Sequence, residues 1–189
     1  PHAGSDLSLI KTKAHKNDNH YLIKGTKIYI THGDQDMSDN IVHLVLAKLP
    51  NSPEGVKGIS LFIVPKFYSN ENGQEIKNDI KVLSVEHKLG HSACPTCVLS
   101  FGEDKGAVGE LIGEPNQGLK AMFTMMNNAR LNVGVQGIAI SERAYQKAFS
   151  FAKERKQGTS LNKNISGSVE IIKHPDVKRM LMEMKSQIE

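Results

Sequence analysis

The sequence predicts an α+β protein: an antiparallel β-barrel or sandwich followed by the first helices of a four-helix bundle. Three observations lead to this prediction. Short β-branched, apolar runs separated by turn residues fill the first part of the chain. The apolar spacing then changes to the helical period, and no crossover helices alternate with the predicted strands. We place the β-domain at residues 1–113 and the helical domain at residues 114–189.

Turn residues separate the predicted strands. The run at 21–31 indicates two short strands that pivot on Gly25. Residues 50–55, which are rich in Pro, Asn and Gly, supply a turn, and the polar segment 69–79 with its Asn72-Gly73 pair is expected to be a loop. The other strands are expected at 41–48, 58–64, 80–86, 96–101 and 107–112.

After residue 118, apolar residues recur at helical spacing almost to Gln157, on two stripes, which predicts a helix packed on two sides. Asparagines favour helix caps, so we expect a helix to restart at Asn127-Asn128. Residues 158–172 are expected to be a linker, and His174-Pro175 opens a second helix. Its predicted core face consists of Val177, Met180, Leu181, Met184 and Ile188. Two helices do not complete a bundle, so we expect the chain to be a fragment of a longer protein.

The composition fits a globular protein, with 39% hydrophobic and 23% charged residues. The formal charge of +4 comes from scattered Lys and Arg rather than from a stripe, so we expect no nucleic-acid partner. A mild basic excess does suit the attraction of an anionic small molecule such as a nucleotide. No apolar run approaches the roughly 18 residues that cross a bilayer, so we expect no membrane span.

The chain has two cysteines, in the segment Cys94-Pro95-Thr96-Cys97, with His87 and His91 upstream. A redox pair or half a zinc site is one interpretation. A thioredoxin-like pair opens a helix, however, and this pair runs into a predicted strand. A zinc site also needs about four ligands. We therefore expect two packed, reduced cysteines.

Several residues are candidates for ligand binding, each with a purely structural alternative. Gly4 and Ser5 form a turn that either is ordinary or brings backbone close to a ligand. Tyr29 and Thr31 share a strand face, which is either half-buried or faces a planar cofactor. Arg130, just after the expected helix start, is either a surface arginine or a phosphate ligand. No hydrolase elbow, Walker loop or Rossmann fingerprint occurs.

A series of segments carries a resemblance to a known family. They are residues 1–6 (PHAGSD), 25–33 (GTKIYITHG), 58–65 (GISLFIVP), 88–96 (KLGHSACPT), 113–119 (GEPNQGL), 127–130 (NNAR) and 152–158 (AKERKQG). Their order along nearly the whole chain strongly resembles the acyl-CoA dehydrogenase family. The resemblance implies the middle β-domain followed by the first two helices of the C-terminal bundle.

The resemblance also implies an activity: α,β-dehydrogenation of an acyl-CoA thioester, with hydride transfer to FAD. It places FAD against Gly4, Ser5, Tyr29, Ile30, Thr31, Arg155, His174 and Pro175, with Arg155 reaching the FAD of a neighbouring subunit. It places CoA against Ser5, Asn127 and Arg130. The implied partners are an electron-transfer flavoprotein and further copies of the chain, as a dimer or tetramer. The implied compartment is the cytoplasm, or the mitochondrial matrix in a eukaryote.

The sequence departs from the family pattern at the catalytic base. One branch has a glutamate just before the arginine that Arg130 matches, and here that position is Ala129. The catalytic base is therefore expected C-terminal to Glu189. The long segment at 67–79 resembles the larger branch, which includes methylthiopropanoyl-CoA dehydrogenases. Two alternatives stay open: an acyl-CoA oxidase, or a non-catalytic β-domain module that binds a nucleotide or a partner.

Overall fold

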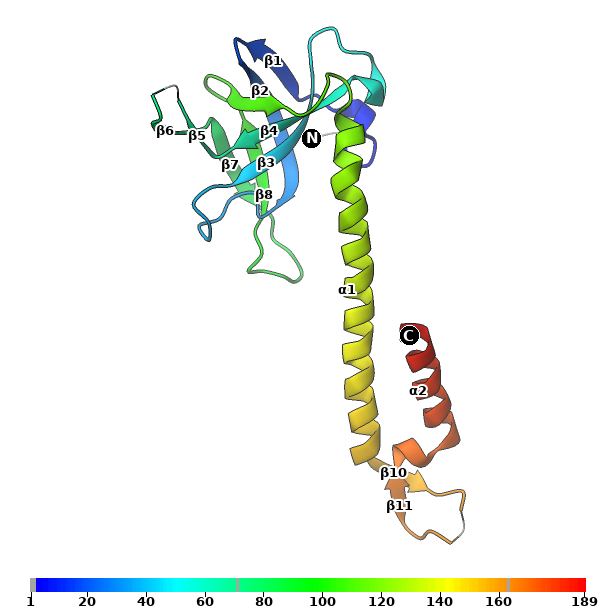
Figure 1. Ribbon diagram of the computed structural model, residues 1–189. Helices are drawn as coiled ribbons and strands as arrows, with labels where there is room; N and C mark the ends of the chain where they lie inside the picture. The colour runs from blue at the N-terminus through cyan, green and yellow to red at the C-terminus, as the bar shows by residue number, and fades with distance from the viewer. Residues whose placement is uncertain (1–2, 71, 163) are drawn as a thin grey trace. The chain divides into compact units, whose positions relative to one another are not determined.

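The computed structural model describes residues 3–70, 72–162 and 164–189 (Figure 1). The chain divides into two compact units, residues 1–125 and 126–189. Pro1 and His2, with which the family resemblance begins, lie outside the described residues. The first unit is a β-barrel and the second is helical, which confirms the predicted α+β class. The proposed division at residues 113 and 114 stays a prediction.

The described residues of the first unit form nine strands. They are β1 (Lys13–Asn17), β2 (His20–Thr31), β3 (Val42–Lys48), β4 (Ile59–Pro65), β5 (Phe67–Ser69), β6 (Glu75–Lys77), β7 (Ile80–Val85), β8 (Thr96–Phe101) and β9 (Ala107–Leu111). Short 3₁₀ turns precede β1 at Leu7–Leu9 and β4 at Gly55–Gly58. The strands predicted near 41–48, 58–64, 80–86, 96–101 and 107–112 are confirmed as β3, β4, β7, β8 and β9.

The main sheet closes into a barrel. Its order is β1-β3-β4-β9-β2-β8-β7, and a further pairing of β1 with β2 joins the ring. All neighbours are antiparallel except β1 and β3, which meet in parallel at Lys13 and Lys48. The buried core fills the interior, with Ile23, Phe62 and Leu99 fully covered. Residues Ile59 to Phe62 of β4 are buried without interruption, so both faces of the strand are covered there.

One long strand, β2, links the two parts of the sheet. Its first half pairs with β1 and β9, and its second half, from Gly25 on, pairs with β8. The pivot at Gly25 is thus a change of partners within one strand, and the prediction of two separate strands is wrong. A Cβ at Gly25 would lie 2.8 Å from Thr12 Oγ1. Glycine therefore lets the chain segment before β1 approach β2 closely.

The structure also corrects a predicted loop, a predicted helix start and a predicted linker. The loop predicted at 69–79 contains the short hairpin β5–β6, and β1 was not predicted at all. Helix α1 (Gly118–Glu154) runs without interruption through Asn127, so no helix restarts there. The linker predicted at 158–172 instead holds strands β10 (Lys156–Thr159) and β11 (Ser168–Glu170), followed by a 3₁₀ turn at Ile171–Lys173.

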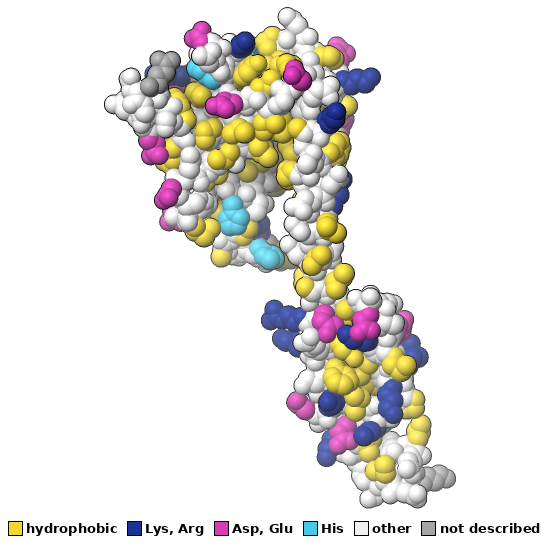
Figure 2. Space-filling view, in the orientation of Figure 1, with side chains coloured by type: hydrophobic (Ala, Val, Ile, Leu, Met, Phe, Trp, Pro, Cys, Tyr) yellow, Lys and Arg dark blue, Asp and Glu magenta, His cyan; other side chains and the backbone are white. Residues whose placement is uncertain are grey.

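The second unit pairs the later part of α1 with α2 (Pro175–Ile188). Leu181, Ala152 and Val169 are its buried apolar residues, and Lys185 of α2 forms an ion pair with Glu142 of α1 (3.5 Å). Of the predicted core face of α2, only Leu181 is buried. Figure 2 shows hydrophobic side chains on the surface of this unit. Ile138 and Ile140, one from each predicted stripe, are exposed.

Candidate functional site

The end of β2 carries an exposed aromatic residue on a β-bulge. The register with β8 shifts between Lys27 and Ile30, so β2 holds one residue more than its partner there. Tyr29 sits in this bulge with φ 58°, in the left-handed region that a residue with a Cβ seldom adopts. Its side chain is 68% exposed. Strained backbone of this kind gathers at functional sites, and here it directs a flat ring outward.

The two residues after Tyr29 fix the bulge in place. Ile30 packs against the barrel core. Thr31 pairs with Thr96 of β8 and is exposed. The ring of Tyr29 and the hydroxyl of Thr31 thus lie on either side of a partly buried side chain that packs on the core. Simple strand alternation predicted that Tyr29 and Thr31 share a face; the structure exposes both, with a bulge at Tyr29.

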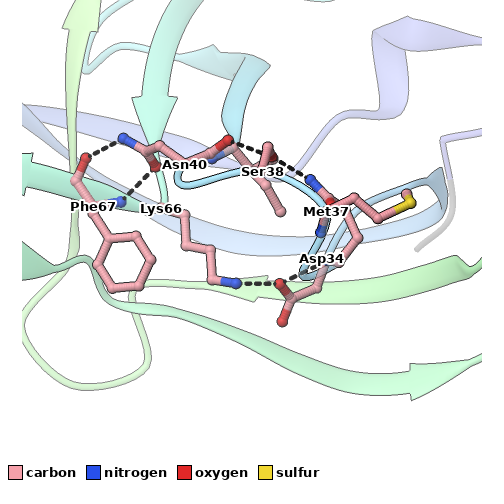
Figure 3. Close-up of polar contacts among 8 residues, drawn as sticks. Asp34, Met37, Ser38, Asn40, Lys66 and Phe67 are labelled. Carbon is pink, nitrogen blue, oxygen red and sulfur yellow. Dashed lines mark hydrogen bonds and ion pairs between the residues drawn. The ribbon is translucent and has the colours of Figure 1, made fainter.

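The loop that follows β2 is tied to the barrel at several points (Figure 3). Lys66 forms an ion pair with Asp34 (2.5 Å), and Asn40 exchanges two hydrogen bonds with the backbone of Phe67 (2.8 and 3.0 Å). The His32 amide also donates to the Pro95 carbonyl (2.8 Å). These bonds anchor the chain to the barrel on the C-terminal side of the bulge, from His32 to Asn40.

Buried charge lies behind the same strand. Lys27 donates from Nζ to the Leu46 carbonyl (2.8 Å), and burial lowers the pKa of Lys27 to about 8. Burial also lowers the pKa of His43; Asp34 opposes that shift and Lys66 adds to it. Both side chains are therefore less cationic than usual near neutral pH, and neither was singled out by the sequence.

Gly4 and Ser5 are exposed and precede the 3₁₀ turn at Leu7–Leu9. Asp6 caps that turn: its carboxylate accepts from the hydroxyl and the amide of Ser8 (2.5 and 3.0 Å), and these bonds lower the pKa of Asp6. Ala3 lines a cavity of about 220 Å³ together with Gly25 and Thr26 of β2. The segment therefore lies beside the middle of β2. Among the residues described, no hydrogen bond or ion pair joins Gly4 or Ser5 to Tyr29, Ile30 or Thr31.

Both cysteines are free thiols. Cys97 is buried in the barrel core, as expected, whereas Cys94 is only half-buried and its Sγ lies 3.4 Å from His32 Nε2. Among the described residues, no group of three or more His, Cys, Asp or Glu side chains is arranged to hold a metal ion.

Asn127 and Arg130 lie one turn apart on α1, and Arg130 Nη1 donates to Asn127 Oδ1 (3.2 Å). Because the helix is continuous there, the backbone amides of these residues are not available as an anion-binding helix start. Only the two side chains can contribute to a site, which corrects the geometry predicted from the asparagines.

Arg155, His174 and Pro175 are brought together around the β10–β11 hairpin of the second unit. Arg155 follows α1 directly, and its Nη2 donates to Gln157 Oε1 (3.5 Å). His174 Nε2 lies 2.8 Å from the Gln157 carbonyl oxygen, and Pro175 begins α2. Gln157 lies in a segment that carries the family resemblance but was not predicted to be a site residue. The Gln157-Gly158 pair directly after a helix was the available signal for this hairpin.

Comparison with known proteins bears on both units. The family described as "Acyl-CoA dehydrogenase, middle domain" matches residues 1–103, and "Acyl-CoA dehydrogenase, C-terminal domain" matches residues 116–189. The 3-methylmercaptopropionyl-CoA dehydrogenase of Ruegeria pomeroyi is 50% identical over 191 residues, which cover 100% of this chain and 32% of that protein. A butyryl-CoA dehydrogenase of Syntrophomonas wolfei is 42% identical over 197 residues, again 100% of this chain and 32% of that protein.

Among solved structures, Caenorhabditis elegans ACDH-11 in complex with C11-CoA aligns with a TM-score of 0.76 at 26% identity. The alignment covers 98% of this chain and 29% of that chain. The chain thus spans 32% of the length of the two curated relatives. In the part of the chain that the structure describes, no helix combines the length and apolarity needed to cross a membrane.

Proposed function

The chain belongs to the acyl-CoA dehydrogenase family, and on that basis we propose that the protein removes hydrogen from the α and β carbons of an acyl-CoA thioester, with FAD as cofactor. The observation that carries the proposal is the Tyr29 ring, exposed on a left-handed bulge and anchored by Ile30. A flat ring displayed at such cost in backbone strain fits the face of a planar cofactor. The flavin supplies the hydride acceptor.

The residues around this strand have distinct proposed roles. Tyr29 covers the isoalloxazine ring, Thr31 offers a hydroxyl to its edge, and Ile30 sets the position of both. Gly4 and Ser5 bring backbone and a hydroxyl to the flavin from the segment beside β2. This proposal is supported by the exposure of Tyr29, Thr31 and Ser5 and by the loop anchors that fix β2.

We propose that Arg155 binds the FAD of a neighbouring copy and that His174 and Pro175 support this site, so that the working protein is a homo-oligomer. The exposed guanidinium and the adjacent Gln157 carboxamide suit a diphosphate. For the CoA moiety we propose the side chains of Ser5, Asn127 and Arg130. The proposed electron acceptor is an electron-transfer flavoprotein. The free cysteines favour a reducing compartment, the cytoplasm or, in a eukaryote, the mitochondrial matrix.

The reaction also needs a carboxylate base. A thioester α proton is too weakly acidic for an ordinary carboxylate, so donors must stabilise charge on the thioester oxygen and a dry pocket must raise the pKa of the base. Ala129 supplies no carboxylate at the position where one branch of the family has it. We therefore place the base elsewhere in the protein, C-terminal to Glu189.

The test is anaerobic bleaching of bound flavin by an acyl-CoA panel added to the full-length protein. The panel includes 3-methylmercaptopropionyl-CoA and butyryl-CoA, the substrates in the names of the two relatives. We expect at least one to bleach the flavin. Protein that binds no FAD would contradict the proposal and favour a binding module, whereas rapid peroxide formation in air would favour an oxidase.

Tyr29 variants test the observation that carries the proposal. Tyr29→Phe keeps the ring and should keep FAD affinity. In Tyr29→Asn, the asparagine tolerates the left-handed backbone conformation but has no ring. We therefore expect FAD affinity to fall roughly two- to tenfold. Equal FAD affinity in both variants, measured by flavin titration of the apoprotein, would remove Tyr29 from the site.

A further inference from the structure

The family resemblance assigns His174 to the cofactor, but in the structure its imidazole engages the protein. Nε2 lies 2.8 Å from the backbone carbonyl oxygen of Gln157, seventeen residues earlier in the chain. A carbonyl oxygen can only accept a hydrogen bond, so Nε2 must carry the hydrogen and donate it. Nε2 of His174 is therefore committed to the β10 backbone.

The hairpin is shaped around this contact. Gly158, next to Gln157, has φ 73°, which favours glycine. A Cβ at Gly158 would lie 3.3 Å from Cε1 and 3.4 Å from Nε2 of His174, closer than most side-chain contacts. The imidazole thus lies directly against Gly158, and glycine satisfies both the backbone conformation and the space that the ring needs.

Backbone hydrogen bonds hold the residues on both sides of the contact between His174 and Gln157. The Arg155 amide donates to Phe151 in α1 (2.9 Å), and its carbonyl accepts from Ile171 (2.8 Å) in the turn before α2. His174 precedes α2, and its carbonyl accepts from the Lys178 amide (3.1 Å). His174 is therefore fixed to α2 on one side and to β10 on the other. The exposed side chains of Arg155 and Gln157 project from the backbone that these bonds hold.

We propose that His174 is a positioning residue: its Nε2–H, held on the Gln157 carbonyl, fixes the start of β10 so that the Arg155 guanidinium and the Gln157 carboxamide are presented together to a diphosphate. The inference rests on the proposed FAD function for the identity of the anion. The hydrogen bond from His174 to the β10–β11 hairpin does not depend on that function. His174 acts through the β10 backbone and does not contact the cofactor.

The experiment compares His174→Ala, His174→Phe and His174→Gln in the full-length protein. Phenylalanine keeps a ring without a donor, whereas glutamine carries an N–H close to the position of Nε2. Hydrogen exchange of the apoprotein, followed by mass spectrometry on peptides covering 156–173, reports on the hairpin. Flavin titration reports on FAD affinity. Lys173→Ala, at the exposed neighbouring position, is the matched control.

We expect the alanine and phenylalanine variants to speed hairpin exchange and weaken FAD binding by roughly two- to tenfold, the effect of one lost hydrogen bond. Glutamine should restore both, and Lys173→Ala should change neither. Weakened FAD binding with unchanged hairpin exchange would overturn the inference and make His174 a direct contact. Unchanged exchange and affinity in His174→Ala would overturn it as well.

The two arms separate this inference from the proposed function. If the wild-type protein binds no FAD, the proposed function fails, and the exchange arm still decides whether His174 locks the hairpin. If FAD binds and bleaches but glutamine fails to restore hairpin protection, the positioning role fails alone.

Discussion

Asp79 shows how one side chain can shape a turn. Its Oδ2 accepts from the amides of Asp104, Lys105 and Gly106 (2.9, 2.9 and 3.0 Å). Partial burial raises the pKa of Asp79, but the three amides and nearby Lys81 outweigh it and lower the pKa below its usual value of 3.8. The charged carboxylate therefore holds the turn between β8 and β9.

This predicts a pH-dependent effect of Asp79→Asn. A carboxylate with a lowered folded-state pKa contributes stability above its unfolded-state pKa and loses it as the pH falls through the folded-state value. We expect the variant to be less stable than wild type near neutral pH. The difference in the free energy of unfolding between the two proteins should become smaller below pH 3.8. Urea unfolding midpoints across this range measure it. A stability difference between Asp79→Asn and wild type that is constant with pH would contradict the account.

At the residue scale, the sequence identified Tyr29 and Thr31 by type and spacing but could not place the bulge. A bulge depends on the register between β2 and β8, which are brought together by the fold rather than by neighbouring residues. Gln157 was missed for a similar reason, because its carbonyl gains its role only through His174, far along the chain.

Helix α1 begins against the barrel, and Gly118 makes this approach possible. A Cβ at Gly118 would lie 2.4 Å from the Ser60 carbonyl carbon and 2.6 Å from the Leu61 nitrogen. The Asn116 amide donates to Ser60 Oγ (2.9 Å) at the same place. The first turn of the helix is thus fitted to β4 backbone to backbone.

Gly118→Ala should therefore destabilise the 189-residue chain by about 1–3 kcal/mol, since backbone must move to admit the methyl group. Gly134→Ala is the matched control within the same helix: nothing lies within 4 Å of its added Cβ, and alanine favours helix by about 0.5–1 kcal/mol. Denaturant unfolding measures both. A stabilising Gly118→Ala would contradict the close approach.

The elements that the sequence predicted are those with strong local patterns. Strands β3, β4, β8 and β9 are apolar runs with turn residues at their ends, and α1 has a long helical period. The elements that it missed are short and polar. Strand β1 has one buried side chain, Ala14, and β10 has none, so neither carries an apolar pattern, and each is held by backbone pairing with the strand that follows it.

At the scale of the whole molecule, the two units predict separate responses to core substitutions. Asn78 is buried in the barrel, where its amide donates to Pro65 and Val108 (both 2.8 Å) and its oxygen accepts from Val108 (2.8 Å) and Asp79 (2.9 Å). Leu181 is the buried residue of α2. Replacing either residue by alanine should lower the free energy of unfolding by roughly 2–4 kcal/mol. Asn78→Ala leaves buried polar groups unpaired, and Leu181→Ala leaves a cavity.

Hydrogen exchange shows in which unit the stability is lost. Asn78→Ala should speed exchange in β4 and β9 and leave α2 unchanged, whereas Leu181→Ala should speed exchange in α2 and leave the barrel unchanged. Asn164→Ala, at an exposed site, should change neither. Faster exchange of α2 in Asn78→Ala would show that the two units open together.

The partners of β2 are translated at different times, so its pairing forms in steps during synthesis. Residues 13–24 contain all of the β1–β2 pairing, so that hairpin can form early in translation. Strands β8 and β9 complete the pairing of β2 through residues 96–101 and 107–109, more than seventy residues later. A nascent chain that has not yet reached β9 carries an open strand edge, which is where aggregation and chaperone capture begin.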